Sequence, residues 1–232
     1  MTAKANPGKK LSITVQFSSY LRFPIKTHQI SDKDDIVTIV RTYAKEMLSD
    51  EDLVVISERV VAITQGRAIP IKKIKPSWWA KKLYTYVHNH PGGIGLRSPY
   101  TMEIAIREAG LWRILLAAGL SVLTKPLGIR GVFYHVVGNN INAIDGPTPY
   151  TLPPGNTSVT LGPKNPEQVA KAVENVVGAG VVIIDANDYG VRVLARSPKA
   201  VAINFPIKKI FADNPMGQSK EQTPLIILRK KK

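Results

Sequence analysis

The sequence contains no cysteine among its 232 residues. Disulfide bonds, cysteine-ligated zinc, iron–sulfur clusters and thiol nucleophiles are therefore excluded, and the lack of a disulfide framework favours a reducing compartment. Acidic residues are also scarce, because 17 Asp and Glu stand against 32 Lys and Arg, which gives a net charge of +15. This positive field attracts phosphates, polycarboxylates or nucleic acid, so it indicates the partner's charge but not its chemistry.

Long hydrophobic runs are missing as well. The most apolar later stretch, Ile114 to Leu123, is much shorter than the roughly 20 residues that a membrane-spanning helix needs. Residues 1–10 carry lysines with no apolar segment behind them, unlike a signal peptide. We therefore expect a cytoplasmic protein with no membrane partner, and with basic tails at 1–10 and 229–232.

The chain is 44% hydrophobic, which is enough to bury a sizeable core. We expect one domain over residues 1–232, or two intertwined subdomains within it. In a first helix-and-strand unit, apolar residues from Ile36 to Leu48 recur at three- and four-residue spacing after the acidic turn 32–35, which predicts a helix. The apolar run Leu53–Ile56 predicts a buried strand that ends in Ser57-Glu58-Arg59.

A second unit repeats this arrangement. Asn165 and Gln168 form a capping-box-like start, and the following apolar face predicts a helix that ends at Gly178. The apolar run 181–184 predicts a strand that delivers Asp185-Ala186-Asn187-Asp188 at its carboxyl end, where α/β proteins commonly bind ligands.

Other segments show weaker patterns. The pattern predicts a helix over 101–118 and strands over 12–17 and 224–228. It also predicts a strand over 132–137 that leads into Gly138-Asn139-Asn140.

The cluster Asp185, Asn187 and Asp188 is the sharpest candidate metal site. Magnesium and manganese prefer carboxylate and carbonyl oxygens, and a tight turn after a strand can present several together. Asp145, placed after the strand expected at 132–137, is a candidate second carboxylate from a neighbouring strand end. The alternative is that both segments are ordinary Asx turns.

A second candidate site binds phosphates. Arg and Lys suit anionic groups, and glycine permits close backbone approach, but the sequence has no Walker-type or GxGxxG loop, so a solvated basic face is the alternative. The candidate residues are Ser57, Arg59, Gln65, Gly66, Arg67 and Lys72.

Two further patterns suggest other functions. His88-Asn89-His90-Pro91 with Ser98 resembles the zinc site of JAB/MPN-type deubiquitinases, but Thr101 stands where that site needs a carboxylate. The alternative is a glycine-rich substrate loop that contains His88, His90, Gly92 and Gly93. Trp78-Trp79 among lysines suits nucleic-acid binding, although adjacent residues do not face one side of a helix or strand and no common nucleic-acid motif is present.

Several blocks resemble the coenzyme F-420 gamma-glutamyl ligase (CofE-like) family. They are PIKT, DKDDI, DLVVISERVVAITQGR, VVIIDANDYG and EQTPLIILR, spread from Pro24 to Arg229. The resemblance implies an α+β fold of intertwined mixed sheets with flanking helices, assembled as a homodimer. It also implies an enzyme that uses GTP and divalent manganese or magnesium to join L-glutamate to an anionic deazaflavin precursor through an acyl phosphate.

By position, the resemblance makes Asp185 the metal-binding residue after the strand, with Ala186 where the family usually has Thr or Ser. The block 57–67 lines the phosphates of nucleotide and substrate. Asn140 takes the position of the family's other metal-binding Asp, so Asp145 is the substitute carboxylate. The alternative function is a non-catalytic binder of phosphorylated ligands or nucleic acid on this scaffold.

Overall fold

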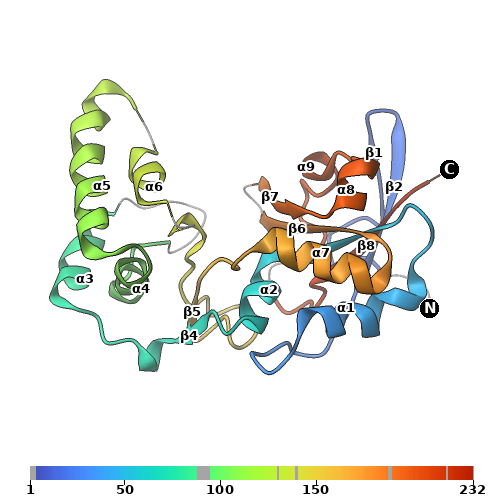
Figure 1. Ribbon diagram of the computed structural model, residues 1–232, viewed down its shortest axis with the longest axis horizontal. Helices are drawn as coiled ribbons and strands as arrows, with labels where there is room; N and C mark the ends of the chain where they lie inside the picture. The colour runs from blue at the N-terminus through green and yellow to red at the C-terminus, as the bar shows by residue number, and fades with distance from the viewer. Residues whose placement is uncertain are drawn as a thin grey trace. The chain divides into compact units, whose positions relative to one another are not determined.

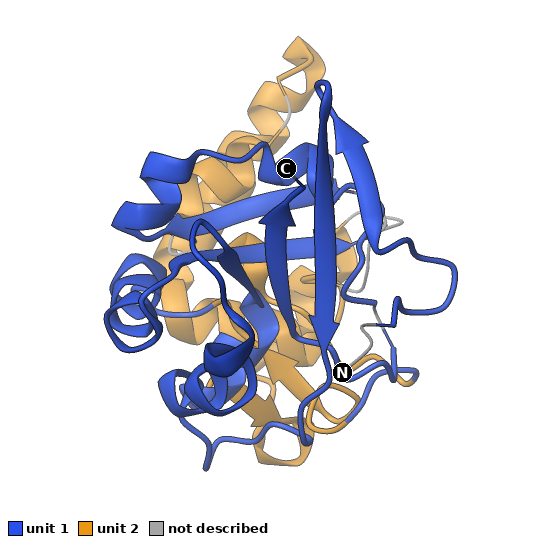
Figure 2. Ribbon diagram, turned by 90° about the vertical axis from the view of Figure 1, so that its right-hand side faces the viewer, with its two compact units in different colours: residues 1–66, 150–152, 163–232 blue, residues 67–149, 153–162 orange. Residues whose placement is uncertain are grey.

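The computed structural model describes residues 4–87, 95–129, 131–138, 141–187, 190–217 and 219–231. The chain forms two compact units, shown in Figure 2. Unit 1 comprises residues 1–66, 150–152 and 163–232, and unit 2 comprises residues 67–149 and 153–162. The mixed α+β class predicted from the sequence is confirmed.

Unit 1 is built on a six-stranded mixed sheet. Its strands, in spatial order, are β1 (Ser12–Val15), β2 (Ser18–Ile25), β8 (Leu225–Lys230), β3 (Leu53–Ser57), β6 (Gly180–Asn187) and β7 (Gly190–Arg196). Strands β3 and β6 run parallel, and every other neighbouring pair in the described sheet is antiparallel. The carboxyl ends of β3 and β6 therefore meet at one edge of the sheet.

Helices cover both faces of this sheet. Figure 1 shows α1 (Ile36–Ala44), α2 (Glu58–Thr64) and α7 (Pro166–Val177) on one side, and α8 (Pro198–Ile203) and α9 (Ile207–Ile210) on the other. A short 3₁₀ turn, η1 (Lys45–Met47), extends α1. The helices predicted at 36–48 and 165–178 and the strands predicted at 53–56, 181–184 and 224–228 are confirmed.

The two parallel strands form the centre of the core. All residues of Leu53–Ile56 and of 181–184 have no exposed surface, which is why both segments read as continuous apolar runs. Gly180 starts β6 because a Cβ there would lie 2.6 Å from Leu53 Cδ2 and 2.7 Å from the backbone nitrogen of Ala200. The glycine thus lets α8 pack directly against β6.

Two details of unit 1 differ from expectation. Asn165 precedes α7 at φ +46° without a side-chain capping bond, and its carbonyl oxygen accepts the N–H of Gln168 instead. Arg229 and Lys230, expected in a basic tail, belong to β8. The start of α1, in contrast, agrees with the prediction from the acidic turn 32–35. Asp35 is the N-cap residue, and its carboxylate accepts the N–H of Thr38 at 2.8 Å.

Unit 2 packs helices beside a two-stranded sheet of β4 (Ala68–Pro70) and β5 (Ser158–Thr160). Its helices are α3 (Trp78–Leu83), α4 (Pro99–Ala109), α5 (Leu111–Thr124) and α6 (Val132–Val137), with the 3₁₀ turns η2 (Ile71–Lys73), η3 (Tyr84–Tyr86), η4 (Lys125–Leu127) and η5 (Ile141–Ala143). Met102, Ile104, Ile114 and Val159 are among the buried residues of its core. Among the described residues, no helix is long and apolar enough to span a membrane.

Two predictions for unit 2 are wrong. The segment 132–137 is the helix α6, which lies against α5 and buries Val137. Its Val and aromatic residues suit a strand, but packing against α5 overrides that preference. The helix expected over 101–118 is two helices, because Gly110 at φ +86° separates α4 from α5.

The remaining sequence motifs of unit 2 have structural roles. Ser98 and Thr101 form a reciprocal capping box at the start of α4, with the Ser98 hydroxyl accepting the Thr101 N–H at 3.0 Å. This accounts for the Ser98 and Thr101 part of the deubiquitinase-like pattern, while its histidines lie outside the described residues. Trp78 and Trp79 are 65% and 41% exposed and touch edge to face, so both are accessible on α3 despite being adjacent.

Glu103 of α4 links this helix to the start of α3, and we expect this link to make the stability of unit 2 depend on pH. Its buried carboxylate accepts the Ser77 N–H at 2.9 Å and the Arg107 Nε–H at 2.9 Å. Burial raises the pKa of Glu103, but these bonds outweigh it and hold the pKa below its usual value. The stability that Glu103 contributes is therefore present above the unfolded-state pKa and is lost as the pH falls through the folded-state pKa.

We expect Glu103→Gln to lower the free energy of unfolding by about 1–2 kcal/mol at neutral pH, because a charge-assisted bond is lost. The difference from wild type should shrink below about pH 4, where the carboxylate of the unfolded chain is protonated. All three tryptophans lie in unit 2, so their fluorescence during urea unfolding reports on this unit. Exposed Glu46→Gln is the control. A difference that stays constant with pH would contradict this role.

Candidate functional site

The candidate site lies in unit 1, where the parallel strands β3 and β6 end. Ser57 at the end of β3 is paired with Ile184 of β6, so the next residues, Glu58 and Asp185, follow at the same edge. Neighbouring strands lie about 4.8 Å apart, which places the two chain segments side by side. Open sheets commonly bind ligands beyond the carboxyl ends of parallel strands.

Asp185 and Asn187 point to a common face of the sheet. Ile184 and Ala186 pack in the cluster that contains α8 and α9, so alternation along β6 puts Asp185 and Asn187 on the opposite face. This is the face that α1, α2 and α7 cover (Figure 1). All three residues 185–187 are partly exposed, in contrast to the fully buried run before them.

Arg192 lies directly across from Asp185. The antiparallel register of β6 and β7 pairs Asp185 with Arg192, and directly opposite residues share a face. A bulge in this pair at Ile183/Ile184 shifts the register just before Asp185. Such bulges change the direction of side chains and are frequent next to functional sites.

The α2 helix adds two more charges at this edge. Glu58 and Arg59 are the first residues of α2, which begins immediately after β3, and both are partly buried. One carboxylate oxygen of Glu58, Oε2, is shielded from solvent. The edge therefore combines two carboxylates, Glu58 and Asp185, with two guanidinium groups, Arg59 and Arg192.

The sequence pattern alone does not indicate Glu58 and Arg192 as site residues. Glu58 lay within the phosphate-binding block, but its place beside Asp185 depends on the parallel pairing of distant strands. A hairpin pattern would have indicated Arg192, because antiparallel pairing of Asn187 with Gly190 puts residue 192 opposite residue 185.

Two expected phosphate ligands make bonds within the fold. Gln65 clamps the backbone of Lys164 with bonds of 2.9 and 2.8 Å. Arg67 donates to the Gly162 carbonyl at 2.6 Å and to Glu108 Oε1 at 2.9 Å. Gly66, at φ +68°, allows the chain to turn at the end of α2. The Gln65 bonds hold the end of α2 within unit 1, and the Arg67 bonds hold the start of β4 within unit 2.

Asp145 and Lys72 belong to unit 2. The backbone of Asp145 forms two 2.9 Å bonds with Thr160 of β5, so Asp145 extends the small sheet. Its expected position after a strand at 132–137 is wrong because that segment is α6. Lys72 is an exposed residue of η2. Asp188, Asn140, His88, His90, Gly92 and Gly93 lie outside the described residues.

The metal prediction therefore rests on the donors at the β3–β6 edge. Among the described residues, no three His, Asp or Glu side chains come together as a preformed metal site. Glu58, Asp185 and Asn187 supply carboxylate and amide oxygens, which are the donors that magnesium and manganese prefer. The donor chemistry fits a hard divalent cation.

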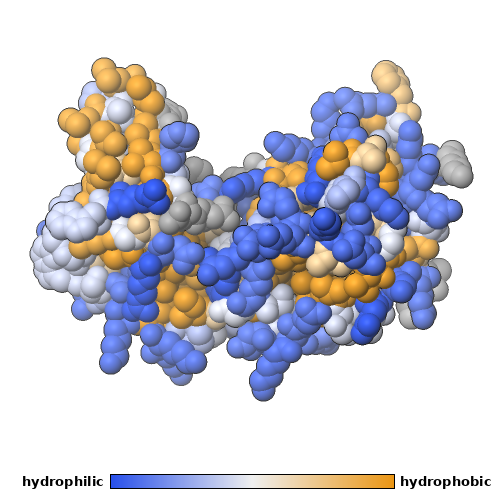
Figure 3. Space-filling model, viewed as in Figure 1, coloured by the Kyte–Doolittle hydropathy of each residue, from blue (hydrophilic) through white to orange (hydrophobic). Residues whose placement is uncertain are grey.

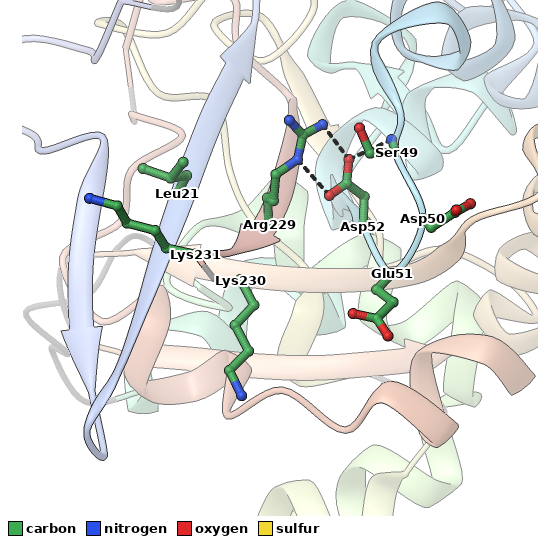
Figure 4. A pocket seen from close by; sticks show the side chains of 8 residues that line it. All are labelled: Leu21, Ser49, Asp50, Glu51, Asp52, Arg229, Lys230 and Lys231. Atoms are coloured by element: carbon green, nitrogen blue, oxygen red, sulfur yellow. Dashed lines mark hydrogen bonds and ion pairs between the residues drawn. The ribbon is translucent and has the colours of Figure 1, made fainter.

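A hollow of about 390 Å³ lies at the other end of β3, beside Asp52 and β8. Arg229 and Asp52 line this hollow, and in Figure 4 their side chains point toward one another, with bonds of 2.9 and 2.7 Å. Asp52 also accepts the N–H of Ser49. The hydrogen bond that Arg229 donates to Asp52 raises the pKa of Arg229. These groups hold the turn before β3 against β8, and the hollow is separate from the candidate site.

Comparison with known proteins identifies the family. A search of curated proteins finds no match. The family model described as F420-0:Gamma-glutamyl ligase matches residues 24–210, which include both strands and all four charged residues of the candidate site. A match over most of the chain shows that this protein belongs to the F420-0:gamma-glutamyl ligase family.

Proposed function

We propose that this protein is a GTP- and divalent-metal-dependent ligase that joins L-glutamate, or a similar amino acid, to the carboxylate of an anionic acceptor such as a deazaflavin F-420 precursor. Family membership supports ligase chemistry. The observation that carries the proposal for this chain is the β3–β6 edge, where Glu58 and Arg59 follow β3 and Asp185, in the last part of β6, is paired with Arg192 of β7.

The proposed reaction has two balanced steps. An acceptor carboxylate oxygen attacks the γ-phosphorus of GTP, the bond to the β-phosphate oxygen breaks, and GDP leaves. The amine nitrogen of glutamate then attacks the acyl carbon, phosphate leaves with the bonding electrons, and the nitrogen loses a proton to give the amide. Both steps bring several anionic groups together, so positioning and charge neutralisation are the main requirements.

Each residue of the edge has a proposed role. Asp185, Glu58 and Asn187 would hold the divalent cation, which neutralises phosphate charge when bound. Arg59 and Arg192 would bind phosphate or carboxylate oxygens, for which the guanidinium geometry is suited. Ser57 is a further phosphate contact in this proposal. The site proposed here is built from unit 1 alone.

The direct test is nucleotide binding measured by thermal shift. GTP, ATP and GDP are each titrated with and without manganese into wild type, Asp185→Ala and Asp50→Ala. Asp50 is exposed at the opposite end of β3 and serves as the matched control. We expect metal-dependent stabilisation by GTP of about 2–3 kcal/mol near 100 times the dissociation constant, lost only in Asp185→Ala. An identical response of all three proteins would refute the site.

The same titration addresses the non-catalytic alternative. Unit 2 carries exposed tryptophans beside Lys81 and Lys82, which is the feature that favours a binder of nucleic acid. Binding of a nucleotide or oligonucleotide without turnover, with affinity that falls steeply with salt and does not depend on Asp185, would favour that function over a ligase.

A further inference from the structure

Three strands of the unit 1 sheet end at the edge that carries the candidate site. Because β8 is antiparallel to both β2 and β3, strands β2 and β3 run in the same direction, and β6 is parallel to β3. Leu225 of β8 lies opposite both Ile25 and Ile56, so the next residues, Lys26 and Ser57, both lie at this edge. Neighbouring strands are about 4.8 Å apart, which puts β2 and β3 roughly 10 Å apart.

The segment that leaves β2 borders this edge. We call residues 26–35, between β2 and α1, the β2–α1 loop. Near its start the N–H of Thr27 donates to the Gln222 carbonyl at 3.0 Å, and the N–H of Ser57 donates to the nearby Pro224 carbonyl at 2.9 Å. In Figure 3 hydrophilic side chains gather over α7 and toward α2, at the end of unit 1 where β3 stops. A polar substrate bound beyond Ser57 therefore has this loop as a neighbour.

The side chain of His28 joins the β2–α1 loop to α1. One ring nitrogen, Nε2, lies 3.0 Å from Asp34 Oδ1, and the other, Nδ1, lies 3.0 Å from the hydroxyl oxygen of Tyr43 in α1. The same hydroxyl oxygen accepts the backbone N–H of His28 at 3.2 Å, and the ring centroids of His28 and Tyr43 are 5.8 Å apart. The imidazole therefore bridges the helix and the part of the loop that leads into it.

The bonds around Asp34 determine which nitrogen of His28 carries the proton. Ser31 donates its N–H, at 2.7 Å, and its hydroxyl, at 2.9 Å, to Asp34 Oδ2. The Ser31 N–H first, and then the Ser31 hydroxyl and His28, outweigh burial and hold the pKa of Asp34 below its usual value, so Asp34 is a carboxylate at neutral pH. A carboxylate only accepts hydrogen bonds, so in the neutral ring Nε2 carries the proton and the Tyr43 hydroxyl donates to Nδ1.

The two halves of the β2–α1 loop are held in different ways. Thr27 and Ile30 are buried, whereas the residues of the turn 31–34 are partly or fully exposed. Packing therefore fixes the first half, and hydrogen bonds fix the turn. Loss of the His28 ring would break the bridge between this turn and α1 without opening the apolar core.

We propose that His28 is a positioning residue for the ligase site, an inference that rests on the proposed function. Its ring holds the turn 31–34 against α1 and so keeps the β2–α1 loop where it borders a substrate bound beyond Ser57 and Asp185. The proposed reaction brings GTP, an amino acid and an acceptor to one edge, so the end of β2 takes part in binding beside the ends of β3 and β6. Because His28 acts through the loop and not on the reacting groups, its loss should raise KM more than it lowers kcat.

The first measurement is hydrogen exchange of the loop amides in the full chain without substrates. His28→Ala removes both ring bonds and Tyr43→Phe removes the hydroxyl, so each should speed exchange of residues 29–34 by about fivefold. His28→Gln still offers an N–H to Asp34 and should lie closer to wild type. The matched control is Thr14→Ala, which removes an exposed hydroxyl–hydroxyl bond of 3.0 Å at the far end of β2. Circular dichroism verifies the fold of each variant.

The second measurement is the steady-state kinetics of amide formation. The substrates are GTP with manganese, L-glutamate and a deazaflavin F-420 precursor, and each is varied in turn. We expect His28→Ala and Tyr43→Phe to raise KM for at least one substrate by about fivefold, with kcat within about twofold of wild type. His28→Gln should recover part of the loss, and Thr14→Ala should match wild type.

The outcomes separate this inference from the proposed function. If wild type forms no amide, the proposed function fails and the positioning role fails with it. If wild type is active but His28→Ala and Thr14→Ala agree in loop exchange or in KM, the inference alone is wrong. A fall in kcat with unchanged KM would also overturn it, because His28 would then act in the chemical step.

Discussion

Asp185→Asn is expected to lower the rate of amide formation by about 10³-fold, because it removes a full negative charge from the proposed cation site while keeping the shape of the side chain. Asp185 is only partly buried at the end of β6, so the substitution should leave the fold intact. GTP cleavage and product formation are measured together, by phosphate release and by mass spectrometry of the acceptor.

Two variants separate this role from others. Asp50→Asn makes the same chemical change on an exposed residue at the opposite end of β3 and should keep wild-type activity. Arg192→Gln removes the charge opposite Asp185 and should raise the KM for a substrate more than it lowers kcat, if it binds ground-state anions. Full activity of Asp185→Asn would contradict the assigned site, even if the protein proved to be a ligase.

The largest expected effect on stability is at the buried ion pair of unit 1. Arg22 of β2 has no exposed surface, and its guanidinium binds Asp213 through both terminal nitrogens. It also donates to the carbonyl oxygens of Ile210, at 2.9 Å, and Lys10. The pair therefore ties the N-terminal segment and the end of α9 to the sheet.

We expect Asp213→Ala to lower the free energy of unfolding by about 3 kcal/mol, since it leaves a buried cation without its counter-charge. This value is at the lower end for such pairs because Asp213 is 40% exposed and the two carbonyl acceptors remain.

Denaturation is followed by far-ultraviolet circular dichroism, with hydrogen exchange of the β2 amides as a local measure. Arg22→Met removes the buried cation itself, and the double variant gives the coupling energy. A loss no greater than that of Asp50→Ala would contradict the account.

The sequence predicts the central part of unit 1 well. Leu53–Ile56 and 181–184 are uninterrupted apolar runs because both faces of these strands are covered, and the helices 36–44 and 166–177 show clear amphipathic spacing. The same pattern indicates that Asp185 follows the buried run, although the structure continues β6 through Asn187, because residues 185–187 pair with β7. These elements are predictable because local pattern and final burial agree.

The errors arise where packing or pairing overrides the local pattern. Segment 132–137 has strand-like residues, but glycines at 131 and 138 bound a helix that packs on α5. That error also misplaced Asp145, which pairs with β5. The proximity of Glu58 to Asp185 depends on strand pairing across more than a hundred residues, for which the local pattern carries no information.

The central claim is that this chain couples the formation of an amide bond to the cleavage of GTP. The most direct measurement incubates the purified protein with GTP, manganese, L-glutamate and a deazaflavin F-420 precursor, and follows the precursor by mass spectrometry. The account predicts a product that gains one glutamyl residue, with one GDP formed for each amide bond. Unchanged precursor and uncleaved GTP, in a sample whose fold is verified by circular dichroism, would contradict it.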